Sequence, residues 1–97
     1  MANALVSIQI LPKTKNGEDT IPFIDRAIGI IIDSGLKYRV GPLETTMEGD
    51  LAQCLEIVRN MNEEMIAAGC APVISQIKIA YNPQGISMDK LTEKYDQ

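Results

Sequence analysis

A short polar stretch in the middle of the chain carries the residue types best suited to binding a ligand. It reads Thr45-Thr46-Met47-Glu48. Threonine hydroxyls donate and accept hydrogen bonds, while an ionised Glu48 accepts strongly and supplies negative charge. Such a set can hold a cation or an amino-bearing heterocycle. The simpler alternative is a structural strand, because threonine favours strands and Glu48-Gly49 is an ordinary exit turn.

Strand geometry limits which of these side chains act together. Side chains alternate between the two faces of a strand, so Thr46 and Glu48 share one face while Thr45 and Met47 share the other. All of them line one surface only if a bulge intervenes.

Further polar and aromatic candidates lie in other extended segments: Ser7, Gln9, Tyr38, Gln76, Lys78 and Tyr81. Ser7 and Gln9 alternate with apolar residues, so they belong to the mixed face of a strand. That face either contacts water or a second subunit, or it contacts a ligand. A tyrosine such as Tyr38 stacks on a ligand ring or protects an edge strand.

Several kinds of chemistry are missing from the sequence. The chain has no histidine, which excludes Ser-His-Asp and Cys-His triads. Cys54 and Cys70 lack zinc or redox spacing, and we expect both to be small buried or half-buried thiols. The carboxylates show no metal-binding spacing, and no glycine-rich phosphate loop is present. We therefore expect no catalytic residue, no metal site and no cofactor.

The composition predicts one globular domain over residues 1–97. Of the 97 residues, 45% are hydrophobic and 23% charged, and the net charge is −4 without a basic run. Nucleic-acid binding is not expected, because it requires clustered lysine and arginine. No signal peptide and no apolar stretch of about 20 residues is seen, so we expect a cytoplasmic protein that does not contact a membrane. A core this small favours an oligomer.

Periodicity and turn signals predict four strands and three helices. The expected elements are strand Leu5–Leu11, helix Ile21–Ser34 capped by Thr20, strands Lys37–Val40 and Leu43–Glu48 joined at Gly41-Pro42, a helix between Asp50 and Gly69, strand Val73–Tyr81, and a short helix from Ser87 to about Tyr95. Asp50 and Gln53 suggest a capping box for the second helix. We expect its inner stripe to be Leu51, Leu55, Val58, Met61 and Met65.

This order of elements is the split β-α-β plan of α+β proteins. It predicts a ferredoxin-like βαββαβ sandwich, with a four-stranded antiparallel sheet, two helices on one face and a short C-terminal helix. The other sheet face then carries Ser7, Gln9, Gln76 and Lys78. An open mixed face and exposed strand edges favour self-association through the sheet.

The chain also resembles a known family, the thiamine-binding, YkoF-like proteins. The resemblance spans about Ala4 to Tyr81 and is carried by Ser7-x-Gln9-x-x-Pro12, by Ser34-Gly35-Leu36-x-Tyr38, and by the series Tyr38, Pro42, Thr45, Glu48, Gly49 and Asp50. The chain departs from the family pattern after its last strand, where it has Ala80-Tyr81-Asn82-Pro83 instead of an acidic-basic cluster. Contacts made there by family members do not transfer to this chain.

The resemblance implies non-covalent binding of thiamine, or of its hydroxymethylpyrimidine part, by a homodimer or homotetramer built through the sheets. Thr45, Ser7 and Gln9 would hydrogen-bond the aminopyrimidine. Glu48 would balance the thiazolium cation, and Tyr38 would supply a ring face. With Thr46, these residues form the expected ligand site.

Two other classes of function fit the residues. A self-associating interaction module without a small-molecule ligand would use the same sheet face. An enzyme on this fold would require a histidine or a buried acid-base pair, and neither is apparent.

Overall fold

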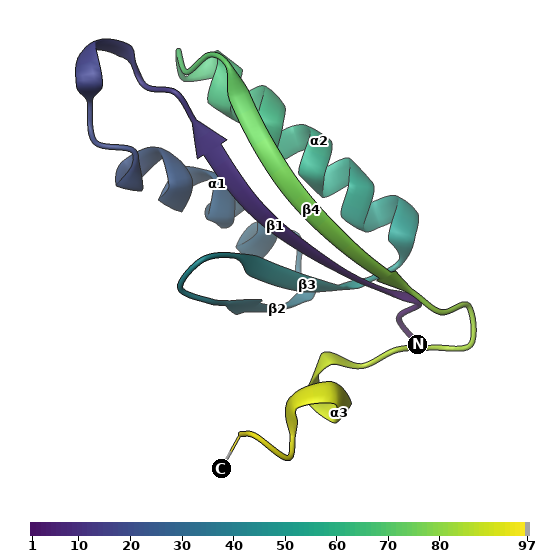
Figure 1. Cartoon of the computed structure of the whole chain (residues 1–97). Coiled ribbons are helices and arrows are strands. Elements are labelled where there is room, and N and C mark those ends of the chain that lie inside the picture. Colours follow the sequence, from purple (N-terminus) through teal and green to yellow (C-terminus); the bar gives the residue numbers. More distant parts are fainter. Residues whose placement is uncertain (97) are drawn as a thin grey trace.

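Four strands form one antiparallel sheet in the order β2-β3-β1-β4 (Figure 1). They belong to a computed structural model that describes residues 1–96. The elements are β1 (Ala4–Pro12), the 3-10 turn η1 (Lys15–Gly17), α1 (Ile21–Asp33), β2 (Lys37–Val40), β3 (Thr45–Gly49), α2 (Leu51–Ala67), β4 (Val73–Tyr81) and α3 (Met88–Thr92). This order confirms the expected α+β ferredoxin-like fold.

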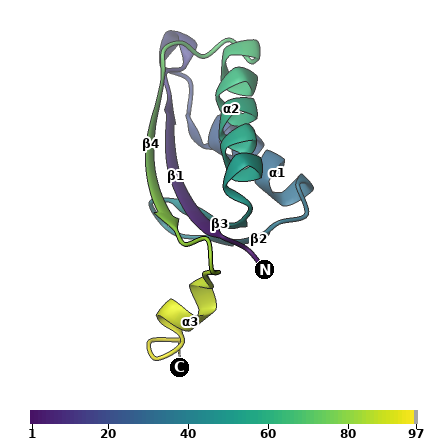
Figure 2. The ribbon, with the colours of Figure 1, turned by 90° about the vertical axis from the view of Figure 1, so that its right-hand side faces the viewer.

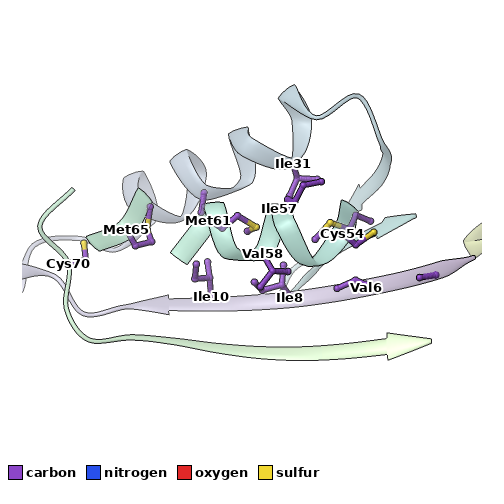
Figure 3. Close-up of a cluster of buried hydrophobic side chains, with 13 residues drawn as sticks. Val6, Ile8, Ile10, Ile31, Cys54, Ile57, Val58, Met61, Met65 and Cys70 are labelled. Atoms are coloured by element: carbon purple, nitrogen blue, oxygen red, sulfur yellow. The ribbon is translucent and has the colours of Figure 1, made fainter. Parts of the chain in front are cut away.

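Helices α1 and α2 lie against the same face of the sheet (Figure 2). They enclose the core with the even-numbered residues of β1 (Figure 3). The core includes Val6, Ile8 and Ile10 from β1, Met47 from β3, Ile31 from α1, and Cys54, Ile57, Val58, Met61 and Met65 from α2. Both cysteines are buried free thiols, as predicted.

The inner stripe predicted for α2 is partly wrong. Leu55 is 42% exposed, whereas Cys54 and Ile57 are buried. Val58, Met61 and Met65 are buried as predicted, so the buried stripe departs from the predicted line only in the first turns of α2. The helix start packs closely against the end of β3, because a Cβ on Gly49 would lie only 2.9 Å from Leu36 Cδ1.

The helix caps differ from the predictions in two places. Thr20 makes no side-chain cap to α1; instead Asp19 Oδ1 accepts from the Ile21 N–H at 3.1 Å. Asp50 caps α2 as expected, by accepting from the Ala52 N–H. The predicted capping box with Gln53 is not the second contact at this helix end. Instead, Asn3 Oδ1 accepts a hydrogen bond of 2.9 Å from the Leu51 N–H.

The hairpin between β2 and β3 has a longer connection than expected. The Gly41 N–H donates to the Glu44 carbonyl at 2.9 Å, so residues 41–44 form a closed turn and β3 begins at Thr45 instead of Leu43. Leu43 is consequently 74% exposed. The β1–β3 ladder stops at the Ile8–Thr45 pair, and the second half of β1 continues past the hairpin with β4 as its partner.

The sheet face opposite α1 and α2, called the open face below, carries alternate residues of all four strands. Its polar members are Ser7 and Gln9 of β1, Lys37 and Arg39 of β2, Thr46 and Glu48 of β3, and Gln76 and Lys78 of β4. The assignment follows from the register, because residues directly opposite each other in a ladder share a face.

Helix α3 lies beside the β2–β3 end of the sheet and contacts its open face through the side chains of Lys37, Arg39 and Glu48 (Figure 1). It begins at Met88, where Ser87 Oγ accepts from the Lys90 N–H, as predicted. It ends at Thr92, earlier than the expected Tyr95. Within residues 1–96, no helix is long and apolar enough to cross a membrane.

Candidate functional site

The predicted ligand residues divide between the two faces of the sheet. Ser7, Gln9, Thr46 and Glu48 lie on the open face. Tyr38 pairs with Met47 and therefore shares the helix-covered face with Thr45. The structure therefore places four of the six predicted residues on one surface and separates the other two from them, as the strand alternation required.

Ser7 and Thr46 form the polar centre of the open face. They lie directly opposite each other in the β1–β3 ladder, and their hydroxyl oxygens are 2.5 Å apart. One hydroxyl hydrogen is used in this contact, while the other hydrogen and the remaining lone pairs are free to serve a ligand. The pair thus offers one donor and adjacent acceptors.

A recess of about 360 Å³ lies between this hydroxyl pair and α3. Its apolar walls are Leu5, Ile79, Ala80, Met88 and Leu91. Its polar lining adds Thr92, Arg39 and Lys78 to the Ser7–Thr46 pair. Apolar walls with a few convergent polar groups are typical of small-molecule sites, whose volumes are about 300–1,000 Å³.

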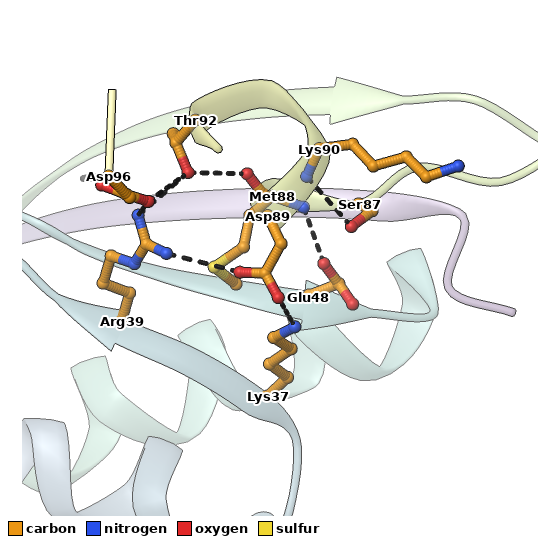
Figure 4. A network of polar contacts seen from close by, with 9 residues as sticks. All are labelled: Lys37, Arg39, Glu48, Ser87, Met88, Asp89, Lys90, Thr92 and Asp96. Atoms are coloured by element: carbon orange, nitrogen blue, oxygen red, sulfur yellow. Dashed lines mark hydrogen bonds and ion pairs between the residues drawn. The ribbon is translucent and has the colours of Figure 1, made fainter. Parts of the chain in front are cut away.

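Ion pairs hold α3 in place beside the recess (Figure 4). Asp89 bonds Lys37 and also Arg39, whose Nη2 is 3.3 Å from Oδ1. Arg39 Nη1 further contacts Asp96 at 3.2 Å and Thr92 Oγ1 at 3.1 Å. The hydrogen bond from Lys37 lowers the pKa of Asp89, and the same bond raises the pKa of Lys37. Both side chains are half exposed, so salt screens these contacts.

Glu48 connects β3 to the first residue of α3. Its Oε1 accepts a hydrogen bond of 2.8 Å from the Met88 N–H (Figure 4). Glu48 lies opposite Lys37 in the β2–β3 ladder. Lys37 therefore has two neighbouring negative charges, Glu48 and Asp89. The carboxylate is thus a structural link to α3 as well as a charge beside the recess.

A second, smaller recess lies between β1, α1 and the 41–44 turn. It has a volume of about 180 Å³ and is lined by Gln9 and Thr45 among mainly apolar residues of β1, α1 and the 41–44 turn. Tyr38 lines neither of these two recesses.

Sequence reasoning missed Arg39, Met88, Leu91 and Thr92 as residues of the larger recess. Arg39 had a usable signal, because it lies opposite Thr46 once the hairpin register is known. The α3 residues had none, since the position of a short terminal helix depends on long-range ion pairs. Among residues 1–96, no cluster of three or more Cys, Asp or Glu side chains is arranged to hold a metal ion.

Comparison with known proteins points to one family. Residues 6–96 match the family model described as thiamine-binding protein. The UPF0045 protein CPE1503 of Clostridium perfringens is 42% identical over 90 residues, which is 93% of this chain and 94% of that protein.

Solved structures agree with this match. A domain of unknown function, DUF77, from Bacillus cereus superimposes with a TM-score of 0.90 at 35% identity, covering 97% of this chain and 90% of that one. A Thermotoga maritima protein provisionally assigned to thiamine biosynthesis or salvage gives a TM-score of 0.85 at 31% identity, covering 96% and 98%.

Proposed function

This chain belongs to the thiamine-binding protein family, and on that premise we propose that it binds thiamine, or the hydroxymethylpyrimidine moiety of thiamine, without catalysing a reaction. The observation that carries the proposal is the Ser7–Thr46 hydroxyl pair at the base of the apolar recess under α3. The protein would serve as a carrier, a store or a sensor of the ligand.

The hydrogen-bonding pattern of the recess supports an aminopyrimidine ligand. The amino group of such a ring donates, and the adjacent ring nitrogen accepts. The Ser7–Thr46 pair supplies the complementary acceptor and donor within a largely apolar enclosure. A buried hydroxyl that loses its partner is costly, so this pair would favour ligands that satisfy both functions.

The charges around the recess support a cationic second half of the ligand. The carboxylates beside it are Glu44, Glu48, Asp89 and Asp96, and the cations are Lys37, Arg39 and Lys78. Glu48 takes part in none of these ion pairs, so its charge would favour a thiazolium over an anionic group at the rim. A direct contact with Glu48 would use Oε2, because Oε1 already accepts the Met88 N–H.

We further propose that the protein is a homodimer or homotetramer associated through its sheet. Strand β4 is a long edge strand, and its other edge has no partner strand among the described residues. It exposes Ile74, Ile77, Ile79 and Tyr81, by 39% to 57%. Edge strands with such apolar side chains require a partner to avoid uncontrolled association.

The exposed apolar side chains of edge strand β4 also favour a second candidate function, a self-associating interaction module without a small ligand. The two candidates differ in their response to thiamine. The test is an equilibrium titration of thiamine into the wild type and into Thr46→Val, which removes one hydroxyl of the pair at nearly constant volume. We expect saturable binding to the wild type and affinity lower by about tenfold in the variant. No saturable binding to the wild type would leave the interaction module as the better description.

A further inference from the structure

The chain that follows β4 is attached to the rest of the protein in two ways, and the change occurs after Ile86. Residues 82–86 are fixed by main-chain hydrogen bonds to the N-terminal residues. The Asn82 N–H donates to the Asn3 carbonyl at 2.8 Å, and the Ile86 N–H donates to the Ala2 carbonyl at 3.0 Å. This loop is therefore anchored by the same kind of bond that holds the strands of the sheet together.

The next segment, residues 87–96, is called the C-terminal strap below. Its helix α3 lies outside the two-layer body formed by the sheet, α1 and α2 (Figure 1, Figure 2). In the described part of the chain, its polar contacts to the sheet pass through the side chains of Lys37, Arg39 and Glu48 (Figure 4). A helix of five residues is not stable by itself, so these contacts and the packing of Met88 keep it folded in place.

The ion pairs of the strap are of the kind that opens easily. The side chains of Asp89 and Asp96 are 52% and 53% exposed, and those of their partners Lys37 and Arg39 are exposed to a similar degree. Exposed ion pairs contribute little to stability and are screened by salt. No residue of the core cluster takes part in them, so the strap is able to open while the sheet, α1 and α2 stay folded.

The strap also forms one wall of the larger recess. Met88, Leu91 and Thr92 line this recess together with the Ser7–Thr46 hydroxyl pair. Met88 is buried, but Leu91 is 58% exposed although it lines the recess. A ring bound in the recess would cover part of the Leu91 side chain, and burial of this apolar surface would favour the closed strap. Occupancy of the recess and closure of the strap would therefore be coupled.

We propose that the C-terminal strap is a lid on the larger recess, which opens as one unit at a hinge between Ile86 and Ser87 and closes over the bound molecule. The identity of that molecule rests on the proposed function, whereas the motion does not. Because the ion pairs of Asp89 and Asp96 hold the lid closed, the affinity for a neutral ligand would fall with rising salt, although such a ligand has no charge to screen. A fixed wall would not produce this dependence.

Hydrogen exchange of the full chain without ligand tests the hinge. The amides of Met88 and Glu93 are expected to exchange several-fold faster in about 1 M than in about 0.05 M sodium chloride, and to change together. The amides of Gly85 and Ile86, which precede the hinge, are expected to keep their rates. Salt-independent exchange of the strap, or an equal acceleration at Ile86, would overturn the proposal.

Binding of neutral hydroxymethylpyrimidine tests the coupling between recess and lid. The probe is expected to slow exchange of the Met88 and Glu93 amides by about fivefold or more at saturation. It is expected to bind about threefold more weakly in the higher of the two salt concentrations. Saturable binding that leaves the exchange of both amides unchanged would overturn the lid.

A double variant separates the lid from the surface that touches the ligand. Neither Asp89 nor Asp96 lines the recess, so Asp89→Asn with Asp96→Asn loosens the strap without removing a ligand contact. Dissociation of the probe is expected to become about three- to tenfold faster, and the salt dependence of its affinity to disappear. Glu64→Gln, which removes an exposed ion pair with Arg26 elsewhere on the surface, is the control and should retain both properties. A double variant that behaves like this control would contradict the lid.

The lid and the proposed thiamine site can fail separately. If neither thiamine nor hydroxymethylpyrimidine binds, the proposed function fails, and exchange of the unliganded chain alone decides whether the strap opens at the hinge. If thiamine binds while the strap amides exchange as in the unliganded chain, the lid is overturned and the proposed function stands.

Discussion

Glu48 on β3 and Met88 on α3, forty residues apart in the chain, are joined by a 2.8 Å hydrogen bond from the Met88 N–H to Glu48 Oε1. One carboxylate thus fixes the start of the helix that forms a wall of the larger recess. This link means that the charge of Glu48 and its structural contact have to be tested separately.

Substitution Glu48→Gln makes that separation. The amide oxygen of glutamine still accepts the Met88 N–H, so α3 is expected to stay in place and the melting temperature to change little. The lost negative charge is expected to weaken thiamine binding about three- to tenfold, and to leave binding of neutral hydroxymethylpyrimidine nearly unchanged. Calorimetric titration with both ligands measures the difference.

Glu48→Ala serves as the matched control, since it removes the charge and the acceptor together. It is expected to weaken both ligands and to loosen α3. If Glu48→Gln lowers stability and the two affinities in parallel, Glu48 is a structural residue only.

Asp89 is expected to control how firmly α3 is attached. Asp89→Asn removes the ion pairs with Lys37 and Arg39, so the amides of Met88 to Thr92 should exchange with solvent several-fold faster while the global melting temperature is little changed. Glu56→Gln, which removes an exposed ion pair with Arg59 on α2, is the control and should not affect α3. Unchanged exchange in Asp89→Asn would show that the ion pairs do not hold the helix.

The same contact predicts a pH dependence with a defined sign. The hydrogen bond from Lys37 depresses the pKa of Asp89 below its ordinary value of 3.8, so the stabilisation is present above that value and is lost as the pH falls through the depressed pKa. For Lys37, the raised pKa means that its contribution persists to pH values above the ordinary 10.5. Exchange of the α3 amides should therefore accelerate below about pH 4, after correction for intrinsic rates, and Asp89→Asn should lose this acid-induced step.

The buried thiols provide a measure of core opening. Cys54 and Cys70 are 0% and 2% exposed, and burial, with Asp50 nearby, raises the pKa of the Cys54 thiol. Because the thiolate is the reactive form, both cysteines should react with an aromatic disulfide reagent at pH 7.5 only at the rate of core opening, and at once in 6 M guanidinium. Rapid reaction of the native protein would contradict the packing in Figure 3.

Self-association is expected to depend on the free edge of β4. The wild type should have the mass of a dimer or tetramer by light scattering at micromolar concentration. Ile77→Lys places a charge on this edge strand and should shift the mass toward the monomer. Ile32→Lys, at a similarly exposed position on α1, is the control. A monomeric wild type would contradict association through the sheet.

The sequence was sufficient for the fold because its signals are local and mutually consistent. Alternation placed Ser7 on the open face and put Thr46 with Glu48 on a single face of their strand, and Pro12, Gly69 and Asp50 marked element ends correctly. Leu55 was misplaced because helical periodicity tolerates an error of one residue in the line of the stripe.

The candidate site was less accessible to sequence reasoning. The larger recess exists only because α3 folds back onto the open face through Asp89, Arg39 and Lys37, and such contacts between distant residues leave no local pattern. The smaller recess depends on β3 starting at Thr45, two residues later than expected, and this offset is set by the turn bond between Gly41 and Glu44.

Calorimetric titration of thiamine into the purified wild-type protein tests the proposed thiamine binding most directly. Hydroxymethylpyrimidine and thiamine phosphates, titrated in parallel, show which part of the molecule is recognised. Thiamine is expected to bind saturably and to raise the melting temperature at saturation. No binding heat with any of these compounds at two temperatures, together with an unchanged melting temperature, would contradict it.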